Sequence, residues 1–215
     1  MVKIVCMSDT HGRHHGLIVP DGNILVHCGD FSARGTELEL MGFLGWFALL
    51  PHPHKVFIAG NHDEALSRGY EYEWLYGPQK VHYLCDSGVE ILGLKFWGTP
   101  WVPPSAGRFI LPVDARREKF ALIPGDVDVL ITHGPPRGFL DQSRNGMHWG
   151  CEVLQESLTG GTLRPKLWMF GHIHGGYGEL DVASRTKLVN CAVMPDYGDG
   201  EASGNLNGVR VVELD

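Results

Sequence analysis

Five short apolar segments of this chain each end in a group of glycine, histidine, aspartate or asparagine. The groups are SDTHG at residues 8–12, CGD at 28–30, GNHD at 60–63, THG at 132–134 and GHIHG at 171–175. Side chains of these types bind divalent metals, and histidine and aspartate also transfer protons. A lone histidine after a strand is usually a structural residue, but five such groups in one chain predict a shared, metal-dependent site.

The segments before these groups are predicted β-strands of one sheet. They span residues 3–7, 24–28, 55–59, 127–132 and 166–170. Most are continuously apolar, which is typical of strands that helices bury on both faces. In such sheets, ligands bind beyond the carboxyl ends of the strands. We therefore expect the five polar groups to converge at one edge.

Further segments predict a second sheet and the helices that cover both sheets. Strand-like segments lie at 81–84, 89–96, 187–193 and 209–214. A capping box of Thr36 and Glu39 begins a helix that runs to about Leu50. Other helices are expected at 114–122 and 151–158, with a weaker signal at 70–75, and two loops, 99–112 and 194–208, have a length typical of function or disorder. The count fits helix–sheet–sheet–helix layering.

Composition narrows the class of protein. A chain of 215 residues with 43% hydrophobic and 20% charged residues is typical of a soluble globular protein, and we expect residues 1–215 to form a single domain. The net charge of −7 argues against a surface for long nucleic acids. If such an acidic chain binds a phosphate, a metal must supply positive charge.

Nothing in the sequence predicts contact with a membrane or secretion. A carboxylate, Asp9, comes before any apolar region of signal length can form, and LELMGFLGWFALL at 38–50 is shorter than the ~20 residues of a membrane-spanning helix. The five cysteines are an odd number without CxxC spacing, which indicates reduced core thiols. We expect a cytoplasmic protein.

The residue types of the five groups limit the choice of metal. Aspartate, asparagine and histidine without cysteine suit Mn, Fe, Co, Ni or Zn. The number of ligands suggests two divalent ions, and a carboxylate at Asp30 is suited to bridge them.

In order, the five groups match the pattern D-x-H, G-D, G-N-H-[D/E], H and G-H-x-H, which resembles the calcineurin-like metallophosphoesterase superfamily. HPHKVFIAGNHD, THGPPRGFLD and RPKLWMFGHIHGGYG are similar to the subfamily of small metallophosphoesterase-domain-containing proteins, which is related to class III cyclic-nucleotide phosphodiesterases. The resemblance implies an α/β fold, a four-layer α-β-β-α sandwich of two mixed sheets flanked by helices.

The resemblance also implies a role for each residue of the groups. One metal would be held by Asp9, His11 and His174, and the second by Asn61, His133 and His172, with Asp30 bridging both and Mn or Fe favoured. His62 would donate a proton to the leaving group or stabilise the transition state, and Asp63 would orient His62. Asn61, His62 and His133 would contact the substrate.

The remaining histidines and one arginine receive other interpretations. Arg137 is a candidate for phosphate contact or for solvent, and His148 for substrate contact or loop packing. His27 lies inside a strand and is expected to be buried and hydrogen-bonded. The others are expected at the surface or in turns: His14, His15, His52, His54 and His82.

The predicted activity is metal-dependent phosphohydrolysis, in which a hydroxide between two metals attacks phosphorus and His62 assists the leaving group. The expected partner is a phosphate ester, with phosphodiesters such as cyclic nucleotides preferred. A phosphomonoesterase or protein phosphatase of the same fold is the alternative. A protein-interaction scaffold is disfavoured because His62 is present, and a processive nuclease because the chain has no basic face. A homo-oligomer is left open.

Overall fold

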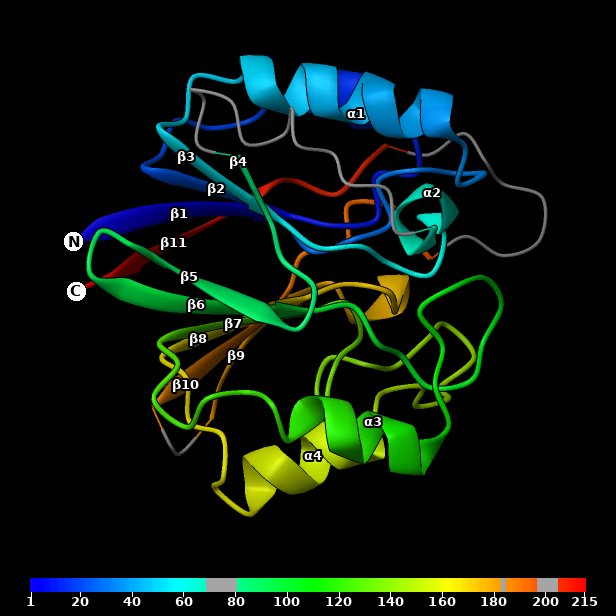
Figure 1. Ribbon diagram of the computed structural model, residues 1–215, viewed down its shortest axis with the longest axis vertical. Coiled ribbons are helices and arrows are strands. Elements are labelled where there is room, and N and C mark those ends of the chain that lie inside the picture. Colours follow the sequence, from blue (N-terminus) through cyan, green and yellow to red (C-terminus); the bar gives the residue numbers. More distant parts are fainter. Residues whose placement is uncertain (69–80, 183–184, 197–204) are drawn as a thin grey trace.

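A computed structural model of the chain describes residues 1–68, 81–182, 185–196 and 205–215. Two β-sheets pack face to face, and helices cover the outer face of each (Figure 1). Helix α1 (Glu37–Leu49) lies on one side, and α3 (Val113–Phe120) and α4 (Glu152–Thr159) lie on the other. The predicted α/β, four-layer arrangement is therefore confirmed.

Both sheets are mixed. The first has the order β11-β1-β2-β3-β4, with strands Arg210–Leu214, Val2–Met7, Ile24–His27, His54–Phe57 and Val81–Tyr83. The second has the order β5-β6-β7-β8-β10-β9, with strands Ser87–Ile91, Leu94–Thr99, Val129–Thr132, Leu167–Phe170, Thr186–Asn190 and Gly178–Val182. Antiparallel strands lie at three of the four edges, and parallel strands lie between them.

The assignment of strands to sheets was predicted wrongly in part. Strands β7 and β8 belong to the second sheet, whereas β4 and β11 belong to the first. The segment predicted as one strand at 89–96 is the hairpin β5–β6, which turns at Leu92 and Gly93 with φ of +54° and +78°. Strand β9 was not predicted. Sheet membership depends on long-range pairing, which the local apolar pattern does not contain.

Alternate residues of the strands serve two hydrophobic cores. In β1, Ile4 and Cys6 point into the core between the sheets, whereas Val5 and Met7 pack with the residues of α1. A third core joins the outer face of the second sheet to α3 and α4, with Trp168 fully buried in it. Burial on both faces explains why the strands are continuously apolar.

The helices begin close to the expected positions. The hydroxyl of Thr36 accepts a hydrogen bond from the Glu39 N–H, and the Glu39 carboxylate accepts one from the Thr36 N–H, which confirms the capping box. Helices α3 and α4 agree with prediction to within two residues at each end. The short helix α2 (Glu64–Ser67) was not predicted, and the helix expected at 70–75 lies outside the described residues. No helix in the described part of the chain is long and apolar enough to span a bilayer.

Two of the histidines expected at the surface or in turns, His14 and His52, are buried. His14 packs against the rings of Phe43 and Trp46 in α1, and the Nε2 of His52 donates a hydrogen bond to the Pro20 carbonyl, 2.9 Å away. His27 is buried and bonded to the Thr10 hydroxyl, as predicted. An imidazole in a turn gives no local signal of which helix will cover it.

Candidate metal centre

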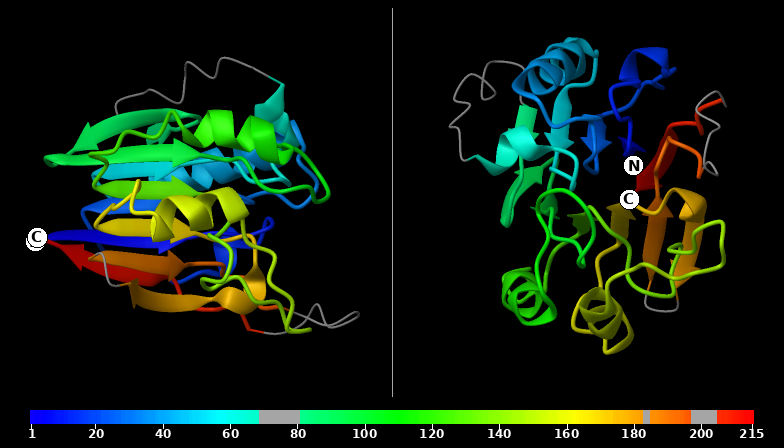
Figure 2. Two further views of the ribbon diagram at one scale, coloured as in Figure 1. Left: turned by 90° about the horizontal axis from the view of Figure 1, so that it is seen from below. Right: turned by 90° about the vertical axis from the view of Figure 1, so that its right-hand side faces the viewer.

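The strand ends that carry the five polar groups meet at one edge of the molecule. The carboxyl ends of β1, β2, β3, β7 and β8 face the right-hand side of Figure 1, and the end-on view in Figure 2 shows their loops together. Glycine permits the close approach: a Cβ on Gly60 would lie 2.2 Å from Asp30 Oδ1, and one on Gly171 would lie 2.0 Å from Asp9 Oδ2. The expected convergence therefore occurs.

The first cluster consists of Asp9, His11 and His174, whose ligand atoms lie within 4.8 Å of one another. Asp9 is fully buried, and its Oδ1 lies 3.4 Å from His174 Nε2 and 4.0 Å from His11 Nε2. Asp9 Oδ2 accepts a hydrogen bond from the His172 N–H at 2.9 Å, but Oδ1 has no hydrogen-bond partner. A buried carboxylate oxygen without a donor fits a cation.

The second cluster consists of Asp30, Asn61, His133 and His172. His133 Nδ1 lies 2.9 Å from the Cys28 carbonyl, so this nitrogen carries the proton and Nε2 is left to bind. Nε2 faces Asn61 Oδ1 at 3.0 Å and Asp30 Oδ2 at 3.3 Å. Three acceptor atoms this close repel one another unless a proton or a metal lies among them.

Asp30 lies between the two clusters. Its Oδ2 is 3.3 Å from His133 Nε2 in the second cluster and 3.9 Å from His11 Nε2 in the first. Its Oδ1 accepts the His62 N–H at 2.8 Å, which holds the carboxylate in this orientation. The geometry is that of a carboxylate able to serve two cations at once.

The pKa shifts of Asp9, Asp30 and His133 show that the two buried carboxylates favour positive charge beside them. Burial alone would raise the pKa of Asp9 and of Asp30, but His174 and His133, respectively, outweigh it and lower both. Burial would lower the pKa of His133, yet the Asp30 carboxylate raises it to about 9. The proton on His133 thus supplies positive charge beside the carboxylates, and bound metal ions would supply the same. The residues present therefore fit two divalent ions.

Backbone strain is concentrated at the same residues. Asp9, His11, Asp30 and His172 have φ of +56°, +42°, +56° and +66°. Non-glycine residues adopt this left-handed region at a cost, and such residues gather at functional sites. The strained backbone conformation thus occurs where four candidate ligands turn toward one point.

His62 lies at the mouth of the centre. Its ring packs edge-on against His11, with 4.8 Å between ring centroids, and its Nδ1 lies 3.3 Å from the Ala33 carbonyl. One of its nitrogens also lies within 4.8 Å of ligand atoms of His11 and Asp30, although His62 is exposed and the residues of the two clusters are not.

Asp63 does not contact the ring of His62 in the way the sequence suggested. Its buried carboxylate accepts four hydrogen bonds, from the N–H groups of Asp30, Gly60 and Ser32 and from the Ser32 hydroxyl. Burial, followed by the charge of Asp30, raises the pKa of Asp63 to about 7. The carboxylate therefore ties the loops of β2 and β3 together, while the Ala33 carbonyl is the ring's partner among the described residues.

Arg137 and His148 lie in the loop between β7 and α4. The His148 Nδ1 bonds to the buried Asp141 carboxylate at 2.6 Å, and Arg137 is exposed. Leu140 of this loop packs closely on the turn after His174, since a Cβ on Gly176 would lie 1.8 Å from the Leu140 carbonyl oxygen. No described contact joins the side chain of Arg137 or His148 to the two clusters, so the loop lies beside the centre and both residues stay predictions.

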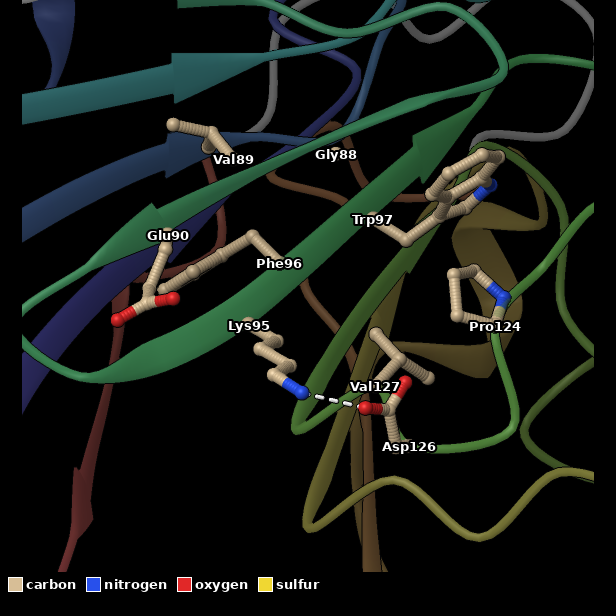
Figure 3. A pocket seen from close by; sticks show the side chains of 9 residues that line it. All are labelled: Gly88, Val89, Glu90, Lys95, Phe96, Trp97, Pro124, Asp126 and Val127. Atoms are coloured by element: carbon tan, nitrogen blue, oxygen red, sulfur yellow. Dashed lines mark hydrogen bonds and ion pairs between the residues drawn. The ribbon is translucent and has the colours of Figure 1, made fainter.

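A separate hollow of about 390 Å³ holds none of the candidate residues (Figure 3). It is lined by β5, β6 and the segment before β7, where Lys95 and Asp126 form an ion pair. Lys95 and Val127 are close to the amino ends of their strands. The hollow is therefore at the end of the sheet opposite to the clusters.

Comparison with known proteins identifies the family and agrees with the fold. Residues 2–176 match the family model described as calcineurin-like phosphoesterase, so the chain belongs to that family. It is 37% identical over 216 residues to human metallophosphoesterase domain-containing protein 1, which covers 89% of this chain and 66% of the human protein. It therefore spans just under two thirds of that relative.

Two further likenesses support the family and the fold. UPF0046 protein C25E10.12 of Caenorhabditis elegans is 34% identical over 213 residues, covering 89% of this chain and 75% of the worm protein. The crystal structure of TT1561 of Thermus thermophilus superposes with a TM-score of 0.62 over 88% of each chain at 12% identity. At that identity the second likeness shows the fold alone.

Proposed function

We propose that this chain is a dinuclear metal-dependent phosphohydrolase that prefers phosphodiesters, cyclic nucleotides among them. One observation carries the proposal: Asp30 Oδ2 lies within 4 Å of imidazole nitrogens from both clusters. The family of the chain supports phosphoester chemistry. The preference for diesters and for nucleotides rests on the resemblance of the sequence.

The residues divide between two ions as the clusters do. Asp9, His11 and His174 would hold one ion and Asn61, His133 and His172 the other, with Asp30 shared. Two divalent ions supply Lewis acidity and a nucleophilic water of lowered pKa when bound. The imidazole, amide and carboxylate donors suit Mn or Fe, and the two clusters as described contain no thiolate that would favour softer metals.

The charge balance permits phosphate to bind to an acidic protein. Asp9 and Asp30 offset only part of the charge of two divalent ions, so the centre stays locally positive although the chain carries −7. Burial of both carboxylates keeps water from screening them. The ligand loops would thus attract the phosphoryl group and orient it at the edge of the sheets.

His62 is the residue we propose for proton transfer. Its Nδ1 donates to the Ala33 carbonyl, which leaves Nε2 to meet the substrate. Protonated at Nε2, the ring would donate to the leaving alkoxide oxygen, or would stabilise charge on the phosphoryl oxygens. Its exposed position beside His11 suits contact with a ligand that arrives from solvent.

Hydrolysis of two nitrophenyl esters tests the substrate class. With Mn²⁺ added, we expect faster turnover of bis-p-nitrophenyl phosphate than of p-nitrophenyl phosphate, and hydrolysis of a cyclic nucleotide. Faster turnover of the monoester would favour the monoesterase alternative. A preparation with two bound metals and no activity on any phosphate ester would instead favour a scaffold.

A further inference from the structure

The loop between β6 and α3, residues 100–112, reaches across to the second cluster. Ala106 and Arg108 of this loop both bond to Asn61: the side-chain Nδ2 of Asn61 donates to the Ala106 carbonyl at 2.9 Å, and the Arg108 N–H donates to the Asn61 carbonyl at 2.8 Å. The loop comes from the second sheet, whereas Asn61 follows β3 of the first. Two hydrogen bonds therefore join the sheets at a candidate ligand.

The bond to Ala106 decides which atom of the amide faces the cluster. With Nδ2 directed at a carbonyl, Oδ1 points to His133 Nε2, 3.0 Å away. A rotated amide would set Oδ1 against the Ala106 oxygen and turn an NH₂ group, which has no lone pair to offer a cation, toward the centre. The Ala106 carbonyl thus selects the orientation in which Asn61 can bind metal.

Gly107 makes this approach sterically feasible. It has φ of +106°, and a Cβ at this position would lie 2.1 Å from the Asn61 carbonyl oxygen. The neighbouring Arg108 also forms an ion pair with Glu64 at 2.9 Å, but both side chains are over one third exposed, so the pair adds little. Backbone contact, rather than surface charge, holds the loop at Asn61.

We propose that the 100–112 loop is a positioning element of the second metal site: the Ala106 carbonyl fixes the Asn61 oxygen toward the ion, and Gly107 is required for the contact. This inference rests on the proposed function, because it assumes that Asn61 is a metal ligand. The first cluster makes no described contact with the loop and is linked to it only through the shared Asp30, which accepts the His62 N–H. A disturbed loop should therefore weaken the second site more than the first.

Stepwise metal binding tests the proposal. The apo proteins are dialysed against increasing Mn²⁺, and bound metal is measured by elemental analysis, with Asn61→Ala and His174→Ala used to assign the two steps. In Gly107→Ala we expect the step assigned to the second cluster to weaken at least tenfold and the other step to weaken clearly less. Gly138→Ala is the matched control, since Gly138 also has positive φ, +83°, but no atom within 4 Å of a Cβ.

Each outcome decides between the proposals. Wild-type affinity at both sites in Gly107→Ala, or equal weakening of both, overturns the positioning role while leaving the metal centre intact. A wild-type protein that binds no metal instead overturns the proposed function itself.

Hydrogen exchange of the wild-type protein gives a second test that needs no variant to fold. We expect Mn²⁺ to slow exchange of the Arg108 N–H at least tenfold, because an ion on Asn61 fixes the carbonyl to which that N–H donates. The Gly138 N–H, on the neighbouring loop, should change less. Unchanged exchange at Arg108 in a protein shown to hold two ions contradicts the inference.

Discussion

The two clusters share Asp30 but differ in how firmly the chain holds them. In the second cluster the side chain of His133 is 0% exposed and His172 is half-buried, whereas in the first cluster His11 is 16% and His174 is 25% exposed. His133 is bonded to the Cys28 carbonyl and Asn61 to that of Ala106. In the first cluster, the described contacts include one hydrogen bond from a histidine ring to a backbone carbonyl, from His11 Nδ1 to Ser32. At 3.3 Å it is longer than the 2.9 Å bond of His133.

This difference suggests that the two clusters bind and exchange their ions differently. Ligands that hydrogen bonds hold in place beforehand, as His133 and Asn61 are held, lose little freedom when they bind a metal, so the second cluster should bind more tightly. The first cluster lies nearer to solvent and to His62, so it should exchange its ion more readily and meet the substrate. The following experiments test whether the two clusters are unequal in this sense.

The largest effect is expected from Asp30→Asn, because both clusters depend on this residue. A neutral amide cannot offset two cations, so we expect loss of at least one ion and a fall in kcat of roughly a thousandfold or more. Elemental analysis and turnover of bis-p-nitrophenyl phosphate measure the two effects. Asp126→Asn, in the hollow of Figure 3, is the control, and two tightly bound ions with near wild-type turnover in Asp30→Asn would refute the shared role.

His62→Ala should separate chemistry from metal binding. We expect both ions to remain, and activity to fall roughly a hundredfold or more on alkyl esters but less on p-nitrophenyl esters. The reason is that an alkoxide needs a proton to depart, whereas nitrophenolate does not. A parallel fall across a series of leaving groups would argue for charge stabilisation instead, and loss of an ion would place His62 among the ligands.

A pair of variants compares the clusters directly. In the apo protein, His133→Ala should lower the free energy of unfolding by about 2–3 kcal/mol, because it leaves a cavity and an unpaired Cys28 carbonyl. His174→Ala should change it by less than about 1 kcal/mol, because the side chain is partly exposed. Urea denaturation measures both, and equal losses would mean that burial does not distinguish the clusters.

The candidate ligands could be found in the sequence because each is tied to the end of a strand. Asp9, Asp30 and His133 follow apolar segments directly, and parallel strands bring such ends to one edge. The prediction of one shared site stayed correct although some strands were assigned to the wrong sheet. The reason is that both sheets present the carboxyl ends of their parallel strands at the same edge.

The contacts that orient the ligands could not be found in this way. Ala106 is 45 residues from Asn61, and Ser32 is 31 residues from Asp63, and neither contact leaves a pattern in the local sequence. The aspartate after His62 looks like a partner for the neighbouring ring, yet it bonds to the backbone of another loop. Only the length of the 99–112 segment indicated that it had a function.

The smallest effect, on acid stability, tests the support beneath the first cluster. Three residues after His11, the buried His14 packs on Phe43 and Trp46, and its Nδ1 has no hydrogen-bond partner. Burial, together with the charge of His15, lowers the pKa of His14 from 6.5 to about 4. The unfolded chain therefore takes up this proton at higher pH than the folded one, and stability is lost as the pH falls from about 6.5 toward 4.

His14→Phe removes the group that must stay neutral and keeps a ring against α1. We expect near wild-type stability at pH 7 and a gain of about 1–2 kcal/mol over wild type at pH 5, measured by urea denaturation of the apo proteins. His15→Gln, at the exposed neighbour, should follow the wild-type curve closely. If His14→Phe loses stability with acid as steeply as wild type, other groups cause the loss of stability between about pH 6.5 and pH 4. The packing beneath the first cluster would then be no more sensitive to acid than that of the second.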